Sequence, residues 1–265
     1  MRIIDLSKEH EELYFVCLED WSEEMKEAGD HKCNWYNKIK DKGLRVKLAI
    51  DDNGSIGGMI QYVPIEYSEA EGENIYFIKC IWVHGHKEGI GNYQGKGMGA
   101  ALLKAAEADA KSLGAKGIAA WGLAIPVWMR ASWYKNHGYK KIDKDSIKHL
   151  VWKPFYDDAI PPKWIKRSKK PATNINPGKV TITAFSSGWC QVENIVYERA
   201  RKAAEEFGDK VVFNSIDTFN KDTLLEWGIS NGLFIEDVEL SMGPPVPYDK
   251  IVKVIAKKLR KISKG

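Results

Sequence analysis

The stretch Ile78-Lys-Cys-Ile-Trp-Val83, followed by Tyr93-Gln-Gly-Lys-Gly-Met-Gly-Ala100 and a helix-like run that ends at Gly114, decides the fold. Three glycines within five residues lie between a strand pattern and a helix pattern. Such a loop can bring its backbone N–H groups close to an anion, because no Cβ stands in the way. The stretch therefore predicts a phosphate-bearing ligand at the start of a helix.

Two nucleotide-binding motifs fit this loop poorly. Gly95, Gly97 and Ala100 match the dinucleotide pattern G-x-G-x-x-A, but the next strand, Gly117–Leu123, ends without the carboxylate that this pattern requires. A P-loop needs Ser or Thr after its Gly-Lys pair, whereas here Gly97 follows Lys96. Both readings of the loop as a nucleotide site are weakened.

The loop Gln94-Gly-Lys-Gly-Met-Gly99 resembles the Q/R-x-x-G-x-G/A acyl-CoA pyrophosphate loop of the GNAT acetyltransferases. Further along, Ala131-Ser-Trp-Tyr134-Lys-Asn-His-Gly138-Tyr139 is similar to the A-x-x-Y-x-x-x-G-F/Y segment of that family. Two motifs in the right order are more specific than either alone. The resemblance covers roughly Met1 to Phe155 and implies an α/β (α+β) fold with a mixed, mostly antiparallel sheet.

The resemblance also implies an N-acetyltransferase that uses acetyl-CoA as cosubstrate, with residues in defined roles. The expected CoA-binding set is Ile81, Trp82, Val83, Gln94, Gly95, Lys96, Gly97, Met98, Gly99 and Ala100. Tyr134 matches the family's general acid, a phenol that can give a proton to the departing thiolate. The family often has an asparagine seven residues before this tyrosine, where this chain has Val127.

Several residues border the acceptor side, but none is singled out as the general base, because each is foremost an ordinary surface residue and water can deprotonate the amine instead. They are Glu73, His84, His86 and Glu88. The connection from His84 to Tyr93 is long and glycine-rich, which predicts a mobile flap. Four tryptophans near the motifs belong either to the core or to an aromatic acceptor cleft: Trp82, Trp121, Trp128 and Trp133. Cys80, His84 and His86 lack a fourth ligand at standard spacing, so we expect no metal.

Local patterns predict the elements around the loop. His10–Leu18 and Trp21–Lys40 read as helical segments. Two strand-like runs, Leu44–Ile50 and Ser55–Val63, are joined by Asn53-Gly54, a strong hairpin signal. The helix after the loop has an apolar face, made by Leu102, Leu103, Ala106, Ala110 and Leu113, and Gly114 is its expected stop.

A change in composition divides the chain into two domains. Residues 157–178 are rich in Pro, Asn, Gly and Lys without periodicity, which is typical of a linker. We therefore expect an acetyltransferase domain over residues 1–156 and a smaller α/β domain over residues 179–265. The smaller domain should contain strands at Lys179–Phe185 and Lys210–Ile216, a hairpin over Leu233–Met242 and an amphipathic last helix.

The smaller domain resembles a thioredoxin-like domain, and the whole chain resembles the YoaP-type acetyltransferases. Trp189-Cys190 stands where thioredoxin-like proteins carry Trp-Cys-x-x-Cys, but Glu193 replaces the second cysteine and Gly232-Leu233-Phe234 replaces the cis-proline segment. A two-cysteine exchange cycle therefore cannot run. Cys190 is a candidate reactive thiol, with the helix dipole favouring its thiolate and Glu193 opposing it. The two effects are similar in size, so we predict a near-ordinary thiol and a domain that serves packing or substrate recruitment. A Cys190 that reacts or senses oxidation is the alternative.

Composition limits the expected partners. The 265 residues carry a net charge of +4, too small to argue for nucleic acid, and no apolar run is long enough to cross a membrane. Four cysteines without paired spacing favour a reducing cytoplasm. We expect an amine acceptor, no nucleic acid and no membrane, and a homodimer is compatible with the sequence. The alternative function is a non-catalytic acyl-CoA-binding or thiol-sensing protein.

Overall fold

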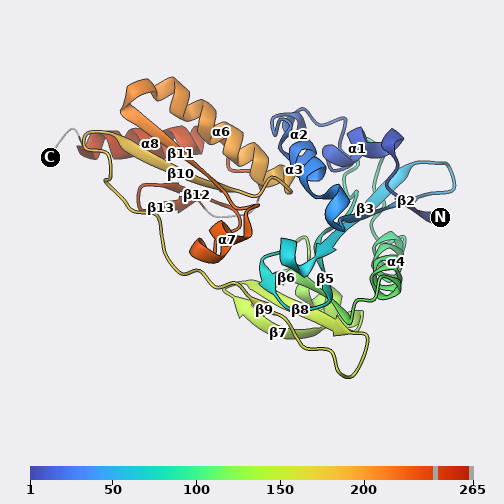
Figure 1. Ribbon diagram of the computed structural model, residues 1–265. Helices are drawn as coiled ribbons and strands as arrows, with labels where there is room; N and C mark the ends of the chain where they lie inside the picture. Colours follow the sequence, from blue (N-terminus) through green and yellow to red (C-terminus); the bar gives the residue numbers. More distant parts are fainter. Residues whose placement is uncertain (241–243, 263–265) are drawn as a thin grey trace. The chain divides into compact units, whose positions relative to one another are not determined.

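A computed structural model describes residues 1–240 and 244–262 of the chain (Figure 1). The chain divides into two compact units. The first unit consists of Met1–Trp21 and Lys38–Lys166, and the second consists of Ser22–Asn37 and the chain from Arg167 onward. The sequence predicts that residues 22–37 belong to the first domain, whereas the structure groups them with the second unit.

The first unit is built on a mixed sheet of seven strands in the order β1-β2-β3-β5-β6-β8-β7. Its neighbouring strands are antiparallel except β5 and β6, which are parallel. The predicted mixed, mostly antiparallel α/β sheet is therefore confirmed. The strands are β1 (Arg2–Asp5), β2 (Arg45–Ile50), β3 (Ile56–Pro64), β5 (Ile75–Val83), β6 (Gly117–Leu123), β7 (Lys140–Asp145) and β8 (Lys148–Pro154). A separate short ladder joins β4 (Ala70–Glu71) to β9 (Lys163–Trp164).

The predicted hairpin between β2 and β3 forms around Asn53-Gly54. The Asp51 carboxylate accepts hydrogen bonds from the N–H groups of Asn53 at 2.9 Å and Ser55 at 2.8 Å. Gly54 adopts a φ of +87°, a backbone conformation that glycine reaches without strain. The hydrogen bonds of the Asp51 side chain thus stabilise the predicted turn between β2 and β3.

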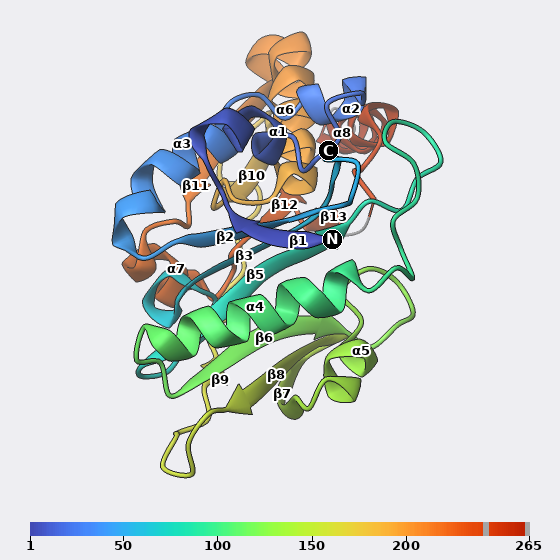
Figure 2. The same cartoon turned by 90° about the vertical axis from the view of Figure 1, so that its right-hand side faces the viewer.

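Helix α4 (Met98–Ser112) packs against β2, β3, β5 and β6, and Figure 2 shows it lying across these strands. Its buried side chains include four of the five predicted apolar positions: Leu102, Leu103, Ala106 and Ala110. Gly114 takes a φ of +85° just after the helix, which is the predicted stop. Because the apolar face of α4 is buried on the sheet, the glycine loop that precedes α4 is held at the edge of the sheet.

The two long helical segments predicted near the N-terminus are broken into shorter pieces. These are a 3-10 turn (Lys8–His10), α1 (Glu11–Phe15), α2 (Glu23–Lys26) and α3 (His31–Ile39). The first break follows from Cys17 and Leu18, which have φ values of +54° and +66°, and the second from Gly29 at +58°. The remaining helix of the first unit is α5 (Ala131–Asn136), and further 3-10 turns lie at Lys40–Lys42 and Ile65–Tyr67.

The second unit contains a four-stranded sheet in the order β11-β10-β12-β13. Strand β10 pairs parallel with β11 and antiparallel with β12, and β12 pairs antiparallel with β13. The elements are β10 (Val180–Ser186), α6 (Gln191–Phe207), a 3-10 turn (Gly208–Lys210), β11 (Val211–Asp217), α7 (Lys221–Trp227), β12 (Gly232–Ile235), β13 (Val238–Leu240) and α8 (Tyr248–Ile262). The predicted hairpin reached Met242, and its residues Ser241 and Met242 lie outside the described residues.

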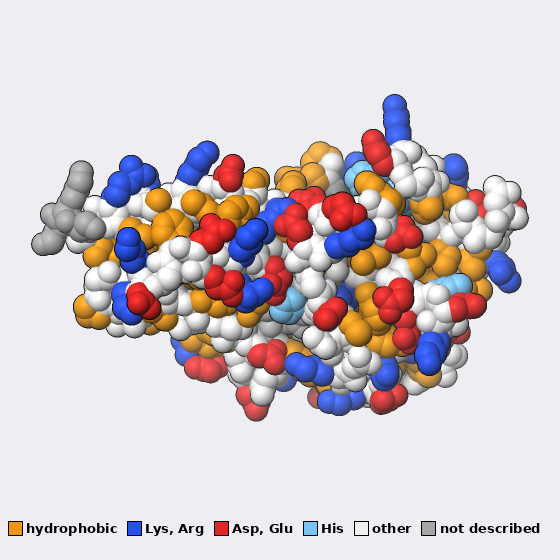
Figure 3. Space-filling view, turned by 90° about the horizontal axis from the view of Figure 1, so that it is seen from above, with side chains coloured by type: hydrophobic (Ala, Val, Ile, Leu, Met, Phe, Trp, Pro, Cys, Tyr) orange, Lys and Arg blue, Asp and Glu red, His pale blue; other side chains and the backbone are white. Residues whose placement is uncertain are grey.

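Helices α6 and α8 pack on the sheet of the second unit and on each other. Their buried faces carry the predicted apolar residues, among them Ile195, Ala200, Ile251 and Ile255. Within the described part of the chain, no helix is both long and apolar enough to cross a bilayer. On the face drawn in Figure 3, acidic and basic side chains are interspersed.

Residues 22–37 join the second unit through ion pairs with helix α6. Arg199, only 12% exposed, contacts the carboxylates of Glu27 at 2.7 Å and Glu24 at 2.8 Å. His31 lies 2.7 Å from the carboxylate of Glu198. The hydrogen bond from Arg199 lowers the pKa of Glu27. The residues in these ion pairs are more than 160 positions apart in the chain. A local sequence pattern therefore cannot predict that residues 22–37 pack on α6.

Replacing Arg199 by Met should loosen residues 22–37. We expect amide hydrogen exchange in α2 and α3 to become roughly fivefold faster, equivalent to the loss of about 1 kcal/mol of ion pairing. Because the folded-state pKa of Glu27 is lowered, this difference should be present above about pH 4.5 and should disappear as the pH falls through the folded value. Lys258→Met is the control, since Lys258 pairs with Asp237 of the same unit and not with residues 22–37. Equal acceleration by both variants would contradict the assignment.

Candidate active site

The glycine loop leaves uncapped backbone donors beside open space. Gly95 and Gly97 have φ values of +76° and +82°, and a Cβ built on either would meet no atom within 4 Å. Helix α4 begins at Met98 with Gly97 as its N-cap residue and no side-chain cap. The N–H groups of Met98, Gly99 and Ala100 therefore have no partner within the helix. Together with the helix dipole, they fit a phosphate group.

Tyr93 anchors the start of the glycine loop to Asp51 and His84. This role was not predicted from the sequence. The Tyr93 hydroxyl donates to the Asp51 carboxylate at 2.8 Å, and this hydrogen bond raises the pKa of Tyr93. Its N–H donates to the carbonyl of His84, also at 2.8 Å. Its ring packs on Gly57 so closely that a Cβ there would lie 2.6 Å from ring atoms. The connection predicted as a mobile flap is thus tied to the β2–β3 hairpin at its end, while Lys96 lies over the same ring at 4.6 Å.

Strands β5 and β6 separate halfway along their length. Their parallel ladder ends at the pair Ile78 and Ala120, whereas β5 stays paired with β3 as far as Val83, and β6 with β8 as far as Leu123. The β3–β5 ladder shifts register at the same level, next to Lys79. We call the resulting gap between the two strands the fork.

Backbone groups of Ile81 and Val83 face the fork. On the β3 side, the N–H of His84 donates to the carbonyl of Gly57 at 2.9 Å. Because hydrogen-bond direction alternates along a strand, residues 81 and 83 direct their N–H and C=O groups to the opposite side. Trp82, the third strand residue predicted to bind CoA, directs its backbone groups toward β3 instead.

Two of the four tryptophans near the motifs, Trp121 and Trp128, donate hydrogen bonds to β5 carbonyls in the fork, where β6 no longer pairs with β5. The indole N–H of Trp121 donates to the carbonyl of Lys79 at 2.8 Å, and that of Trp128 donates to the carbonyl of Ile81 at 3.1 Å. Their rings meet edge to face at 5.2 Å. Carbonyls that lost their partners on β6 are satisfied in this way. On β5, the N–H of Ile81 and both backbone groups of Val83 also face the fork.

Tyr134 lies on α5 and is completely buried. Its hydroxyl donates to the thioether sulfur of Met129 at 3.5 Å, a weak acceptor. Burial, with a smaller contribution from the Cys80 thiol, raises the pKa of Tyr134 well above its usual value of 10. The phenol therefore keeps its proton at neutral pH, as a general acid must. The helix is held close to β6 because Gly122 approaches the backbone of Ala131, where a Cβ would lie within 2.8 Å.

The four candidate bases occupy different environments. Glu73 and Glu88 are exposed. His84 is fully buried, with Nδ1 lying 2.8 Å from the carbonyl oxygen of Gly91 and Nε2 accepting the indole N–H of Trp21 at 3.1 Å. Its Nδ1 must therefore carry the proton, and its Nε2 lone pair is already used. His86 is half exposed and lies 3.5 Å from the carboxylate of Glu19, a residue that sequence reasoning missed.

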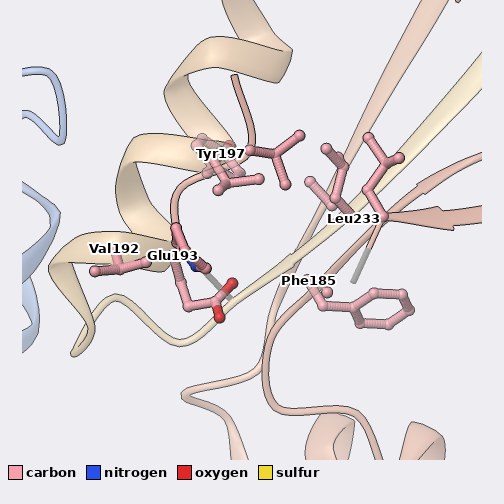
Figure 4. A pocket seen from close by; sticks show the side chains of 11 residues that line it. Phe185, Val192, Glu193, Tyr197 and Leu233 are labelled. Carbon is pink, nitrogen blue, oxygen red and sulfur yellow. The ribbon is translucent and has the colours of Figure 1, made fainter. Parts of the chain in front are cut away.

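Cys190 of the second unit is the N-cap residue of α6 and is partly buried. Glu193, one turn further on, lines a small pocket together with Phe185, Tyr197 and Leu233 (Figure 4). The cavity volume of about 10 Å³ holds about one water molecule. Among the described residues, no group of three or more Cys, His, Asp or Glu side chains is placed to hold a metal.

The fork and the uncapped helix start together make a class of site that suits a thioester carrying a phosphate group. The acetyltransferase (GNAT) family model matches residues 5–139, just over half of the chain. The chain therefore belongs to the acetyltransferase (GNAT) family. A search of the curated proteins finds no match.

Solved structures of the family resemble the chain in part. The PaiA N-acetyltransferase from Thermoplasma acidophilum in complex with coenzyme A is 20% identical, with 58% of this chain and 100% of that chain covered and a TM-score of 0.43. A GNAT family acetyltransferase from Brucella melitensis in complex with acetyl-CoA is 15% identical, with 62% and 94% covered and a TM-score of 0.40. A ribosomal-protein-alanine N-acetyltransferase from Brucella melitensis is 14% identical, with 58% and 100% covered and a TM-score of 0.44.

Gly97 and Gly114 allow a matched test of the loop. Both have positive φ values and open space at the Cβ position, but they lie at opposite ends of α4. Alanine at either position should cost about 1 kcal/mol of stability through backbone strain. Only Gly97→Ala should also weaken CoA binding, by about tenfold or more, because the strain displaces the N–H groups that face the phosphate. Calorimetric titration with CoA measures this, and equal affinities for the two variants would refute the loop as the binding site.

Proposed function

We propose that the chain is an acetyl-CoA-dependent N-acetyltransferase that moves an acetyl group to a primary amine by direct attack on the thioester. The observation that carries the proposal is the fork beside the uncapped start of α4. One end offers N–H groups to a diphosphate, and the other offers the backbone of Ile81 and Val83 to a pantetheine chain. A carrier bound in this way would lie along the edge of β5.

Each bond change in the proposed reaction has a group to support it. The lone pair of a neutral amine attacks the thioester carbon, and a backbone N–H at the fork stabilises the developing oxyanion. The C–N bond forms and the C–S bond breaks. The departing thiolate takes the proton of the Tyr134 hydroxyl, which recovers a proton from solvent. The proton released from the amine nitrogen goes to a base or to water.

We further propose that the second unit is a thioredoxin-like accessory domain of the YoaP type. The strand order β11-β10-β12-β13, with one parallel and two antiparallel pairs, supports this. Cys190 precedes α6 in the position of a redox thiol, but Glu193 stands in place of a second thiol. Recruitment of the acceptor therefore suits this unit better than disulfide exchange.

One observation favours the rival function, a non-catalytic acyl-CoA-binding or thiol-sensing protein. Tyr134 is fully buried, so a thiolate can reach its hydroxyl only by entering the fork. In that rival, CoA binds without turnover. Release of free CoA from acetyl-CoA in the presence of a panel of primary amines separates the two functions.

Tyr134→Phe should lower kcat by roughly a hundredfold while CoA affinity stays within about twofold, because only proton donation to sulfur is lost. The defect should be the same at pH 6.5 and pH 9, since burial keeps the phenol protonated over that range. Tyr139→Phe is the matched control, an equally buried tyrosine whose ring lies 5.2 Å from that of Tyr134. Unchanged turnover of every responsive amine in Tyr134→Phe would remove the catalytic role.

A further inference from the structure

An aromatic cluster with a carboxylate at its side lies at the end of β5, next to the fork. The half-exposed imidazole of His86 has three aromatic neighbours, with ring centroids at 5.9 Å for Trp21, 6.0 Å for Trp82 and 5.5 Å for His84. The carboxylate of Glu19 lies 3.5 Å from Nε2 of His86. Aromatic faces beside a carboxylate are chemistry that suits a cationic amine.

The Glu19 side chain is only 7% exposed, although carboxylates rarely lie buried without a cation or hydrogen-bond donors nearby. Its distance to His86 is in the ion-pair range and longer than a tight hydrogen bond. A carboxylate at Nε2 favours the proton on that nitrogen, which leaves the lone pair of the neutral ring on Nδ1. Glu19 can therefore orient His86 as a proton acceptor.

The backbone before Glu19 is strained. Cys17 and Leu18 both adopt positive φ values, a conformation that side chains other than glycine, asparagine and aspartate rarely take. Leu18 is also buried, with 1% exposure. Two such residues in succession cost on the order of 1 kcal/mol each. This strain ends α1 and places Glu19 against His86, and strain of this kind gathers at functional sites.

His84 shows by contrast why His86 is the residue to consider. His84 uses both ring nitrogens, one toward Gly91 and one toward Trp21, so it has no lone pair to offer. Trp21 is further held by the close approach of its indole to Gly89. His84 thus positions Trp21, while the half-exposed His86 keeps access to solvent and to an incoming amine.

We propose that His86, oriented by Glu19, accepts a proton from the ammonium group of the acceptor, which binds between Trp21 and Trp82. The assignment rests on the N-acetyltransferase function proposed above and deepens it. The substrate class is a primary amine on a flat or apolar body. The N–H bond of the ammonium breaks, its proton moves to Nδ1 of His86, and the nitrogen keeps the electron pair that attacks the thioester. The proton then leaves to solvent.

The titratable groups placed against His86 include Glu19 and His84. Glu19 approaches it from the segment after α1, and His84 faces it from its own loop with its lone pair engaged. A fall in wild-type kcat/KM toward acid pH that is absent from His86→Ala is therefore the outcome expected of a base at this position. An engaged His84 cannot produce this fall.

The test compares His86→Ala and Glu19→Gln with Lys87→Ala, which changes an exposed neighbour in the same loop. Acetyl-CoA with phenethylamine, tryptamine, benzylamine or cadaverine serves as the probe, and CoA release is followed from pH 5.5 to 9.5.

We expect kcat/KM of His86→Ala at pH 7 to fall about a hundredfold relative to the wild type. This difference should shrink at high pH, where more of the amine is already neutral. Added imidazole should restore at least part of the rate. The kcat/KM of Glu19→Gln should fall about tenfold while its CoA affinity stays unchanged, because the carboxylate no longer orients the His86 ring.

Calorimetry with CoA shows whether each variant keeps its binding site. Rates for His86→Ala within about twofold of Lys87→Ala, or an acid limb that persists in His86→Ala, would overturn the assignment of His86 while leaving the acetyltransferase intact. If the wild type binds CoA but acetylates none of the amines, the proposed function fails and this assignment fails with it. Should His86→Ala lose CoA binding through misfolding, the near-isosteric Glu19→Gln decides by whether its kcat falls while CoA binding is kept.

Discussion

The separation of β5 from β6 is the constraint on which the first unit depends. Beyond Ile78 and Ala120 the backbones of the two strands are no longer paired, and buried backbone groups need other partners. Trp121 and Trp128 satisfy two of the carbonyls. Backbone groups of Ile81 and Val83 also face the gap.

Features governed by neighbouring residues could be predicted from the sequence. The hairpin at Asn53-Gly54, the glycine loop and the buried face of α4 all form as expected, because each depends on residues a few positions apart. The fork could be expected only from the family resemblance. Helix α1 ends early because Cys17 and Leu18 have positive φ values, which a right-handed helix does not allow. Helix propensities do not predict a turn at cysteine and leucine.

Long-range pairing explains what local patterns missed. The sequence offered His84 and His86 as equal candidates, two residues apart in one loop. Trp21, which lies 63 positions before His84, occupies the lone pair of that ring, and Glu19 stands beside the other. Every histidine can donate or accept a proton at its ring nitrogens. Partners that are distant in the sequence decide which nitrogen carries the proton and whether the other has a lone pair available.

The placement of Ser22–Asn37 has a consequence for how the chain is made. This segment leaves the ribosome long before α6, whose Arg199 and Glu198 neutralise its charges. At the usual pace of synthesis it waits roughly ten to thirty seconds for those partners. During that interval Glu24, Glu27 and His31 lack their partners on α6, so assembly of the second unit has to be post-translational or late in synthesis.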